Sequence, residues 1–240
     1  MRIPRWSQTF FAVTMIGIGI LGLVQGAFTP TWTGVPRRVP GREGLIYLTA
    51  VLSLACGVGL LWQRTAVAAA RVLAIAFLVW LLFRAWHFFL EPPSVAIWWA
   101  CGDSLVMLGA AWVLSGDKGL RFARAVYGLG LIPFGVAHFT FLQRTVSLVP
   151  GWLPWHTAWA YITGGAFIAA GIAVIAGVRA RLAAVLVTLQ LALFTLLVWV
   201  PIVTAHPTAS DWTEFVSSIV LTSAAWVVAD SYRMGPRAAG

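Results

Sequence analysis

The sequence has 240 residues, of which 60% are hydrophobic and 10% are charged, and its formal net charge is +9. Soluble domains carry about 25% charged residues, so this composition excludes a soluble globular protein and predicts an all-α membrane protein. The basic charge does not indicate a nucleic-acid-binding surface, because its distribution along the chain follows a membrane topology.

Eight apolar runs follow one another, each close to the roughly 20 residues that a membrane-spanning helix needs. They cover residues 8–28, 44–62, 72–89, 95–114, 125–142, 159–178, 182–203 and 212–229. None shows the alternating pattern of β-barrel strands, so we predict eight transmembrane helices. Arg2 and Arg5 precede the first run as in a signal peptide, but no A-x-A cleavage site follows it. We therefore expect this run to stay as the first transmembrane helix.

The chain repeats itself at a spacing of 114 residues. Val35, Pro36 and Pro40 recur as Val149, Pro150 and Pro154, and the segment AAWV at 110–113 recurs at 224–227. A constant spacing at both ends of a unit indicates a tandem duplication. We predict two parallel four-helix repeats, residues 1–116 and 121–230, related by a pseudo-two-fold axis along the membrane normal, with a tail at 231–240.

Arginine and lysine are distributed unequally between the two sides of the membrane that eight spans define. One side carries eleven of them: Arg2, Arg5, Arg64, Arg71, Lys118, Arg121, Arg124, Arg179, Arg181, Arg233 and Arg237. The other side carries five: Arg37, Arg38, Arg42, Arg84 and Arg144. The positive-inside rule then predicts a multi-pass protein of the plasma (inner) membrane with both termini in the cytoplasm and membrane lipids as its partners.

The segments that follow the first helix of each repeat are short and interrupted by proline. They cover residues 29–42 and 143–158, and the second also contains Trp152 and Trp155. We predict interfacial or shallow re-entrant segments. Two roles stay open, a lid over a lateral entrance for a lipid-soluble ligand and simple anchoring of tryptophan at the interface.

Glycine and proline within the runs predict local helix geometry. Glycines concentrate in the first, fifth and sixth runs, where small residues allow helices to approach closely in lipid. Pro133 and Pro201 are the two positions at which we expect kinks.

Ionisable residues inside the membrane are functional candidates, because each costs about 2.5–3.5 kcal/mol on insertion scales. Asp103 lies eight residues inside the outer end of its helix, roughly 12 Å deep. Arg84 is shallower, and His87 follows it about one turn further out. We predict an ion pair between Arg84 and Asp103, which either belongs to a ligand site or orients the two helices.

The second repeat differs from the first at these polar positions. Ser217 replaces Asp103, and Val198 lies opposite Arg84, or Thr195 if a short gap is allowed. His138 stands where the first repeat has Gln25, one residue out of register. A site built asymmetrically in the outer half of the bundle explains this divergence, and so does drift. His138 either contacts a ligand such as a quinone carbonyl or bonds a neighbouring backbone carbonyl.

The sequence shows no residue pattern typical of a metal site or of a disulfide bond. The histidines His87, His138, His156 and His206 lie in separate segments, without the spacing that places two ligands on one helix face. Cys56 and Cys101 are predicted at different depths, so we expect two free thiols.

Three stretches carry a family resemblance: GLIPFGVAHF at 130–139, LVPGWLPWH at 148–156 and WAYITGG at 159–165. The second repeat, roughly residues 120–230, resembles DoxX-like integral membrane proteins, which are four-helix membrane bundles. The resemblance implies a fused double bundle close to quinone chemistry, with quinone as the implied cofactor and a redox subunit as partner. It assigns no catalytic residue and leaves open whether the chain is an enzyme.

The sequence therefore predicts an accessory subunit of a quinone-linked membrane redox system. Its expected ligand-binding residues in the outer half are His138, Arg84, Asp103, His87 and Gln25. The alternatives are a carrier of a lipid or small solute and a structural scaffold.

Overall fold

The computed structural model describes residues 5–35, 39–90, 95–116, 119–205 and 208–233, which form helices and no strand. Eight helical spans in this part of the chain are long and apolar enough to cross a membrane, which confirms the prediction of an all-α membrane protein. The elements are α1 (Arg5–Gln25), the 3-10 turn η1 (Pro30–Trp32), α2 (Arg42–Leu61), α3 (Ala66–Leu90), α4 (Val95–Ser115), α5 (Leu120–Thr140), α6 (Leu142–Ser147), α7 (His156–Ala176), α8 (Ala180–Phe194), the π-helical turn η2 (Thr195–Trp199), α9 (Val200–Ala205) and α10 (Ala209–Ser231).

The long helices begin at nearly constant spacing. Helix α5 begins 115 residues after α1, and α7, α8 and α10 begin 114 residues after α2, α3 and α4. The seventh span is formed by α8, η2 and α9 together, as residues Ala180–Ala205.

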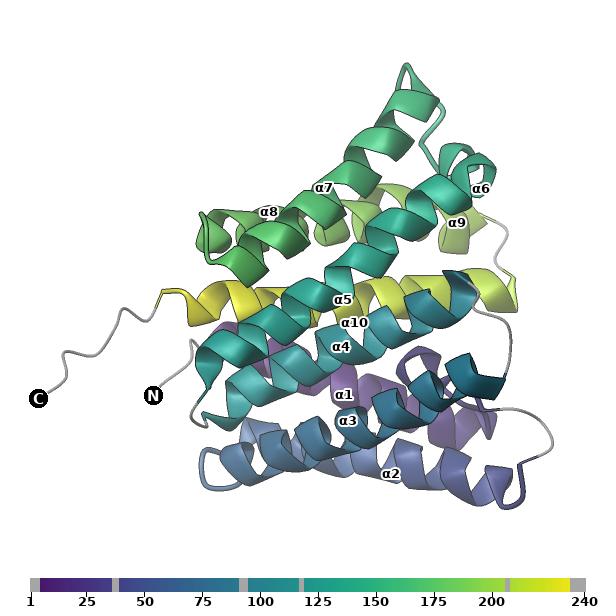
Figure 1. Ribbon diagram of the computed structural model, residues 1–240. Coiled ribbons are helices and arrows are strands. Elements are labelled where there is room, and N and C mark those ends of the chain that lie inside the picture. The colour runs from purple at the N-terminus through teal and green to yellow at the C-terminus, as the bar shows by residue number, and fades with distance from the viewer. Residues whose placement is uncertain (1–4, 36–38, 91–94, 117–118, 206–207, 234–240) are drawn as a thin grey trace, which may run out of the picture.

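The helices lie in a bundle with α4 and α10 near its middle (Figure 1). These two helices are also the most buried of the described spans. Within each half, successive long helices pack against each other in chain order. Helix α5 packs on α4, and α10 packs on both α1 and α4, so these four helices join the halves.

The two ends of the bundle differ in charge. The start of α1, the turn between α2 and α3 and the end of α10 lie together on the left of Figure 1. The described arginines of this end include Arg64, Arg121, Arg179 and Arg233, and we call it the basic end. The opposite end, which holds η1 and α6, is called the far end. The assignment of the basic end to the cytoplasm stays a prediction.

Glycines allow the closest helix crossings. A Cβ on Gly102 would lie 2.9 Å from the carbonyl oxygen of Gly130, and a Cβ on Gly130 would lie 2.8 Å from that of Gly102. The crossing of α5 and α7 is similar, because a Cβ on Gly135 would come within 2.5 Å of the Gly164 oxygen. Backbones thus meet directly where the sequence predicted close packing.

The two prolines inside the spans have different effects. Pro201 lies two residues after the end of the π-helical turn Thr195–Trp199. Proline lacks an N–H and crowds the carbonyl four residues earlier, and a wider turn relieves that crowding. Helix α5, in contrast, continues through Pro133 without a break, so only the distortion expected at Pro201 interrupts the α-helix.

Candidate functional site

Arg84 is buried within the first half, with 2% of its surface exposed. Its Nε and Nη2 donate hydrogen bonds of 3.1 and 2.9 Å to the carbonyl oxygen of Thr33. Nη2 also donates to Thr33 Oγ1 at 3.1 Å and to the Thr31 oxygen at 3.4 Å. Nη1 donates to Ser104 Oγ at 2.8 Å and to the carbonyl oxygen of Ala100. The guanidinium therefore links α3, α4 and the segment around η1.

The predicted ion pair between Arg84 and Asp103 was wrong. Among the described residues, the ion pairs join Arg144 to Glu214 at 3.5 Å and Arg233 to Asp230 at 3.4 Å. Oδ1 of Asp103 is buried and accepts no hydrogen bond from the part of the chain that the structure describes. Backbone carbonyls and hydroxyls satisfy the guanidinium instead, because the segment around η1 inserts between the helices beside Arg84.

The segment around η1 is a plug formed by buried residues: Thr29, Pro30, Thr31, Trp32 and Val35. Trp32 is 1% exposed and stacks on Phe77, with ring centroids 4.6 Å apart and an interplanar angle of 9°. The rings of Trp32 and Trp80 are nearly perpendicular, at 89°, with centroids 5.2 Å apart. Trp32 Nε1 donates a 2.8 Å hydrogen bond to Ser53 Oγ. The first of the two proline-rich segments thus enters the bundle, as a re-entrant segment does.

The corresponding segment of the second half stays at the surface. Its short helix α6 has no buried residue, and Trp152 and Trp155 are 69% and 81% exposed. Phe167 stands 114 residues after Ser53 and is buried. An aromatic ring from α7 therefore lies where the first half has only a serine that bonds Trp32, which explains why no plug enters here.

His138 lies near the far end of α5, half-buried among aromatic rings of α7 and α8. Its ring centroid is 5.4 Å from that of Phe167 and 6.1 Å from that of Phe194, to which it is nearly parallel at 22°. Nδ1 is 2.7 Å from the carbonyl oxygen of Phe134, one turn earlier. The bond to a neighbouring carbonyl, one of the two alternatives for this residue, is thus present, and Nε2 makes no hydrogen bond to any described residue.

The remaining predicted site residues do not join one cluster. Gln25 is exposed at the end of α1. His87 belongs to the last turns of α3, but its side chain lies outside the described residues, as do Arg2, Arg37, Arg38, Lys118, His206 and Arg237. The contacts of Arg84 and those of His138 have no residue in common, so the structure shows two separate polar centres.

Sequence reasoning missed the hydrogen-bond partners of Arg84 and the aromatic neighbours of His138. Thr33 and Ser104 accept hydrogen bonds from Arg84, and Phe167 and Phe194 flank His138. Trp32 was the available signal, since it is an aromatic residue in a short loop that also carries prolines.

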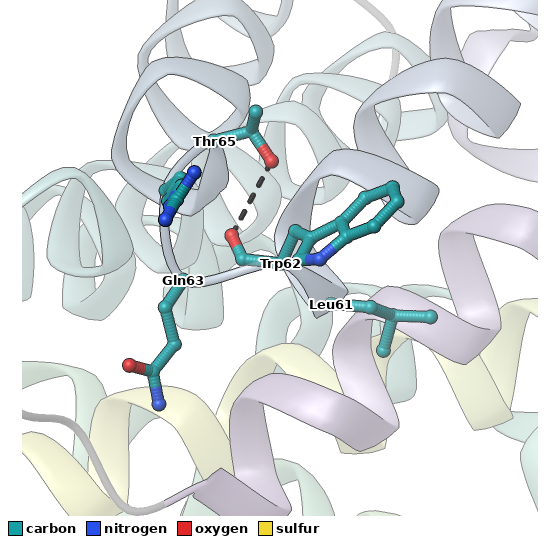
Figure 2. Close-up of a pocket in the computed structure, with 5 residues that line it drawn as sticks. Leu61, Trp62, Gln63 and Thr65 are labelled. Atoms are coloured by element: carbon teal, nitrogen blue, oxygen red, sulfur yellow. Dashed lines mark hydrogen bonds between the residues drawn. The ribbon is translucent and has the colours of Figure 1, made fainter.

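The cysteines, the potential metal ligands and a surface hollow offer less to a functional site. Cys56 and Cys101 are free and buried. Within the described ranges, no group of three acidic, histidine or cysteine side chains gathers as metal ligands would. A hollow at the turn between α2 and α3 is lined by Leu61, Trp62, Gln63, Arg64 and Thr65 (Figure 2). All five of these residues are exposed, and the Thr65 hydroxyl bonds the Trp62 oxygen at 3.3 Å, so this hollow is a shallow surface feature.

Comparison with known proteins adds no relative. No protein-family model matches the sequence, and no curated protein and no solved structure matches the chain.

Proposed function

We propose that this membrane protein is an accessory subunit of a quinone-linked redox system and that His138 binds the head group of a quinone-pool molecule. The observation that carries the proposal is the aromatic setting of an imidazole with one uncommitted nitrogen. Phe167 and Phe194 flank the ring, and Nδ1 is held by the Phe134 oxygen, which fixes its orientation. An oriented polar atom beside aromatic faces is a common way to bind a planar lipid-soluble ligand.

The position of His138 supports access from the lipid phase. The span Ala180–Ala205, which carries Phe194, is the least buried of the eight. Leu193, Leu196 and Leu197 are exposed on it, and their apolar surface suits an isoprenoid tail. A head group at His138 would therefore keep its tail in the bilayer.

The direct test is mass spectrometry of gently purified protein for bound quinone. We expect near-stoichiometric quinone in the wild type and its loss in His138→Phe, which keeps an aromatic ring but removes both nitrogens. Gln25→Ala is the matched control, because Gln25 holds the equivalent position in the first half and is exposed. Wild-type protein that contains phospholipid alone would contradict the proposal, as would equal losses in both variants.

A structural scaffold is the second candidate, and the surroundings of Arg84 favour it for the first half. All its described hydrogen bonds go to the chain itself, and the plug that it holds is buried. In that role Arg84 stabilises the bundle and binds no ligand. Retained quinone in an Arg84 variant that still folds would separate this structural centre from the site at His138.

A further inference from the structure

We propose, resting on the function proposed above, that the His138 site selects the reduced form of its ligand, a quinol, because Nε2 accepts a hydrogen bond. The inference starts from the bond on the other nitrogen. A backbone carbonyl has no proton to give, so the 2.7 Å contact between Nδ1 and the Phe134 oxygen requires the proton on Nδ1.

The neutral ring then has its lone pair on Nε2. A neutral imidazole donates from one nitrogen and accepts at the other. A second proton would place a positive charge on a ring that lies beside the aromatic rings of Phe167 and Phe194, which is costly in apolar surroundings. Nε2 is accordingly an acceptor whose partner must supply a hydrogen.

This atom remains open to a ligand. Nε2 has no hydrogen-bond partner among the described residues, and it is not among the unpartnered polar atoms that are fully enclosed. The Cβ of His138 packs closely on Gly164, since a Cβ added at that glycine would lie only 2.8 Å from it. The imidazole is therefore held between α5 and α7. Its Nε2 points away from the hydrogen bond that Nδ1 makes with the Phe134 oxygen.

The two redox forms of the ligand differ in what they offer to such an atom. A quinol hydroxyl donates a hydrogen bond to Nε2, whereas a quinone carbonyl has only lone pairs and would oppose the lone pair of Nε2. A site built to hydrogen-bond a hydroxyl discriminates against an analogue that lacks it, because the polar group is then left unpaired. Any planar, lipid-soluble compound with a hydroxyl group could donate the same hydrogen bond. The test therefore compares a ligand that donates a hydrogen bond with matched ligands that do not.

The experiment titrates the full chain in lipid nanodiscs, under anaerobic conditions, with three short-tailed probes. They are a ubiquinol analogue, the corresponding ubiquinone, and the dimethyl ether of the quinol, which keeps the shape but has no hydroxyl hydrogen. We expect the quinol to bind about tenfold more tightly than the other two, as one additional hydrogen bond of about 1.4 kcal/mol implies. In His138→Phe the three affinities should agree within about twofold.

The possible outcomes separate this inference from the proposed function. Equal binding of quinol and quinone to the wild type would overturn the selection of the reduced form and leave quinone binding intact. Tighter binding of the quinone would show that Nε2 donates, which also overturns it. Absence of binding by all three probes would overturn the proposed function itself. The dimethyl ether keeps the test decisive on wild-type protein even if His138→Phe does not fold.

Discussion

Trp32 and Ser53 are joined by a 2.8 Å hydrogen bond from the indole nitrogen to the serine hydroxyl, deep within the first half of the bundle. The bond connects a loop residue to the middle of α2, and the indole also stacks on Phe77 of α3. A segment outside the long helices therefore supplies part of the packing between them. The stability of this half should depend on the plug as much as on the helices.

Replacement of Trp32 tests this dependence. Trp32→Ala should lower the free energy of unfolding by about 3–5 kcal/mol, because it leaves a large cavity between α2 and α3. For a chain of this size each kcal/mol corresponds to about 2–4 °C in Tm. Trp32→Phe retains a ring and should cost about 1 kcal/mol for the lost hydrogen bond. Trp152→Ala is the control, since Trp152 is exposed, and thermal unfolding in detergent is the measurement. Similar Tm values for the two alanine variants would contradict the role of the plug.

Arg84 and Asp103 should respond unequally to substitution. Arg84→Met removes the donors that hold Thr31, Thr33 and Ser104, and we expect a loss on the order of 3 kcal/mol. Asp103→Asn removes a charge whose Oδ1 has no described hydrogen-bond partner, so Tm should stay the same or rise. A double-mutant cycle measures the coupling directly. Comparable losses in both single variants, with strong coupling between them, would restore the ion pair that the sequence suggested.

Glycine at the crossing of α5 and α7 provides a test of backbone contact. A Cβ at Gly135 would lie 2.5 Å from the Gly164 oxygen and equally close to Ile168. Gly135→Ala should therefore separate the helices and cost about 1–3 kcal/mol. Gly165→Ala is the matched control on α7, because no atom lies within 4 Å of a Cβ there. Its Tm should be unchanged or slightly higher, given the better helix propensity of alanine; equal effects at the two sites would argue against close packing at this crossing.

Labelling from each side tests the predicted orientation in the membrane. Replacing the two buried cysteines, Cys56 and Cys101, by alanine gives a cysteine-free background. A single introduced cysteine is then the target of the labelling reagent. Gln63→Cys reports on the basic end and Trp155→Cys on the far end, and both positions are exposed. If the basic end faces the cytoplasm, a membrane-impermeant maleimide should label position 155 on intact cells and position 63 only after lysis. The opposite pattern would reverse the topology.

The sequence was sufficient for the helices, because membrane spans depend on a local property. A run of about 20 apolar residues satisfies its backbone polar groups within a membrane only as a helix, and the part of the chain that the structure describes has eight such spans. The expected distortion at Pro201 and the close glycine crossings follow from equally local rules. The hydrogen bond between His138 and Phe134 belongs to the same class, since the two residues are one helical turn apart.

The partners of Arg84 were decided by the tertiary structure alone. Its acceptors are mostly backbone carbonyls, which every residue carries and which leave no mark in a sequence. A search for an oppositely charged side chain therefore led to Asp103, while the loop around Thr33, about fifty residues earlier in the chain, supplied the oxygens. The two proline-rich segments likewise look alike in sequence. Packing distinguishes them, because Trp32 enters beside the small Ser53 in the first half, whereas the second half has the bulky Phe167 at the equivalent position.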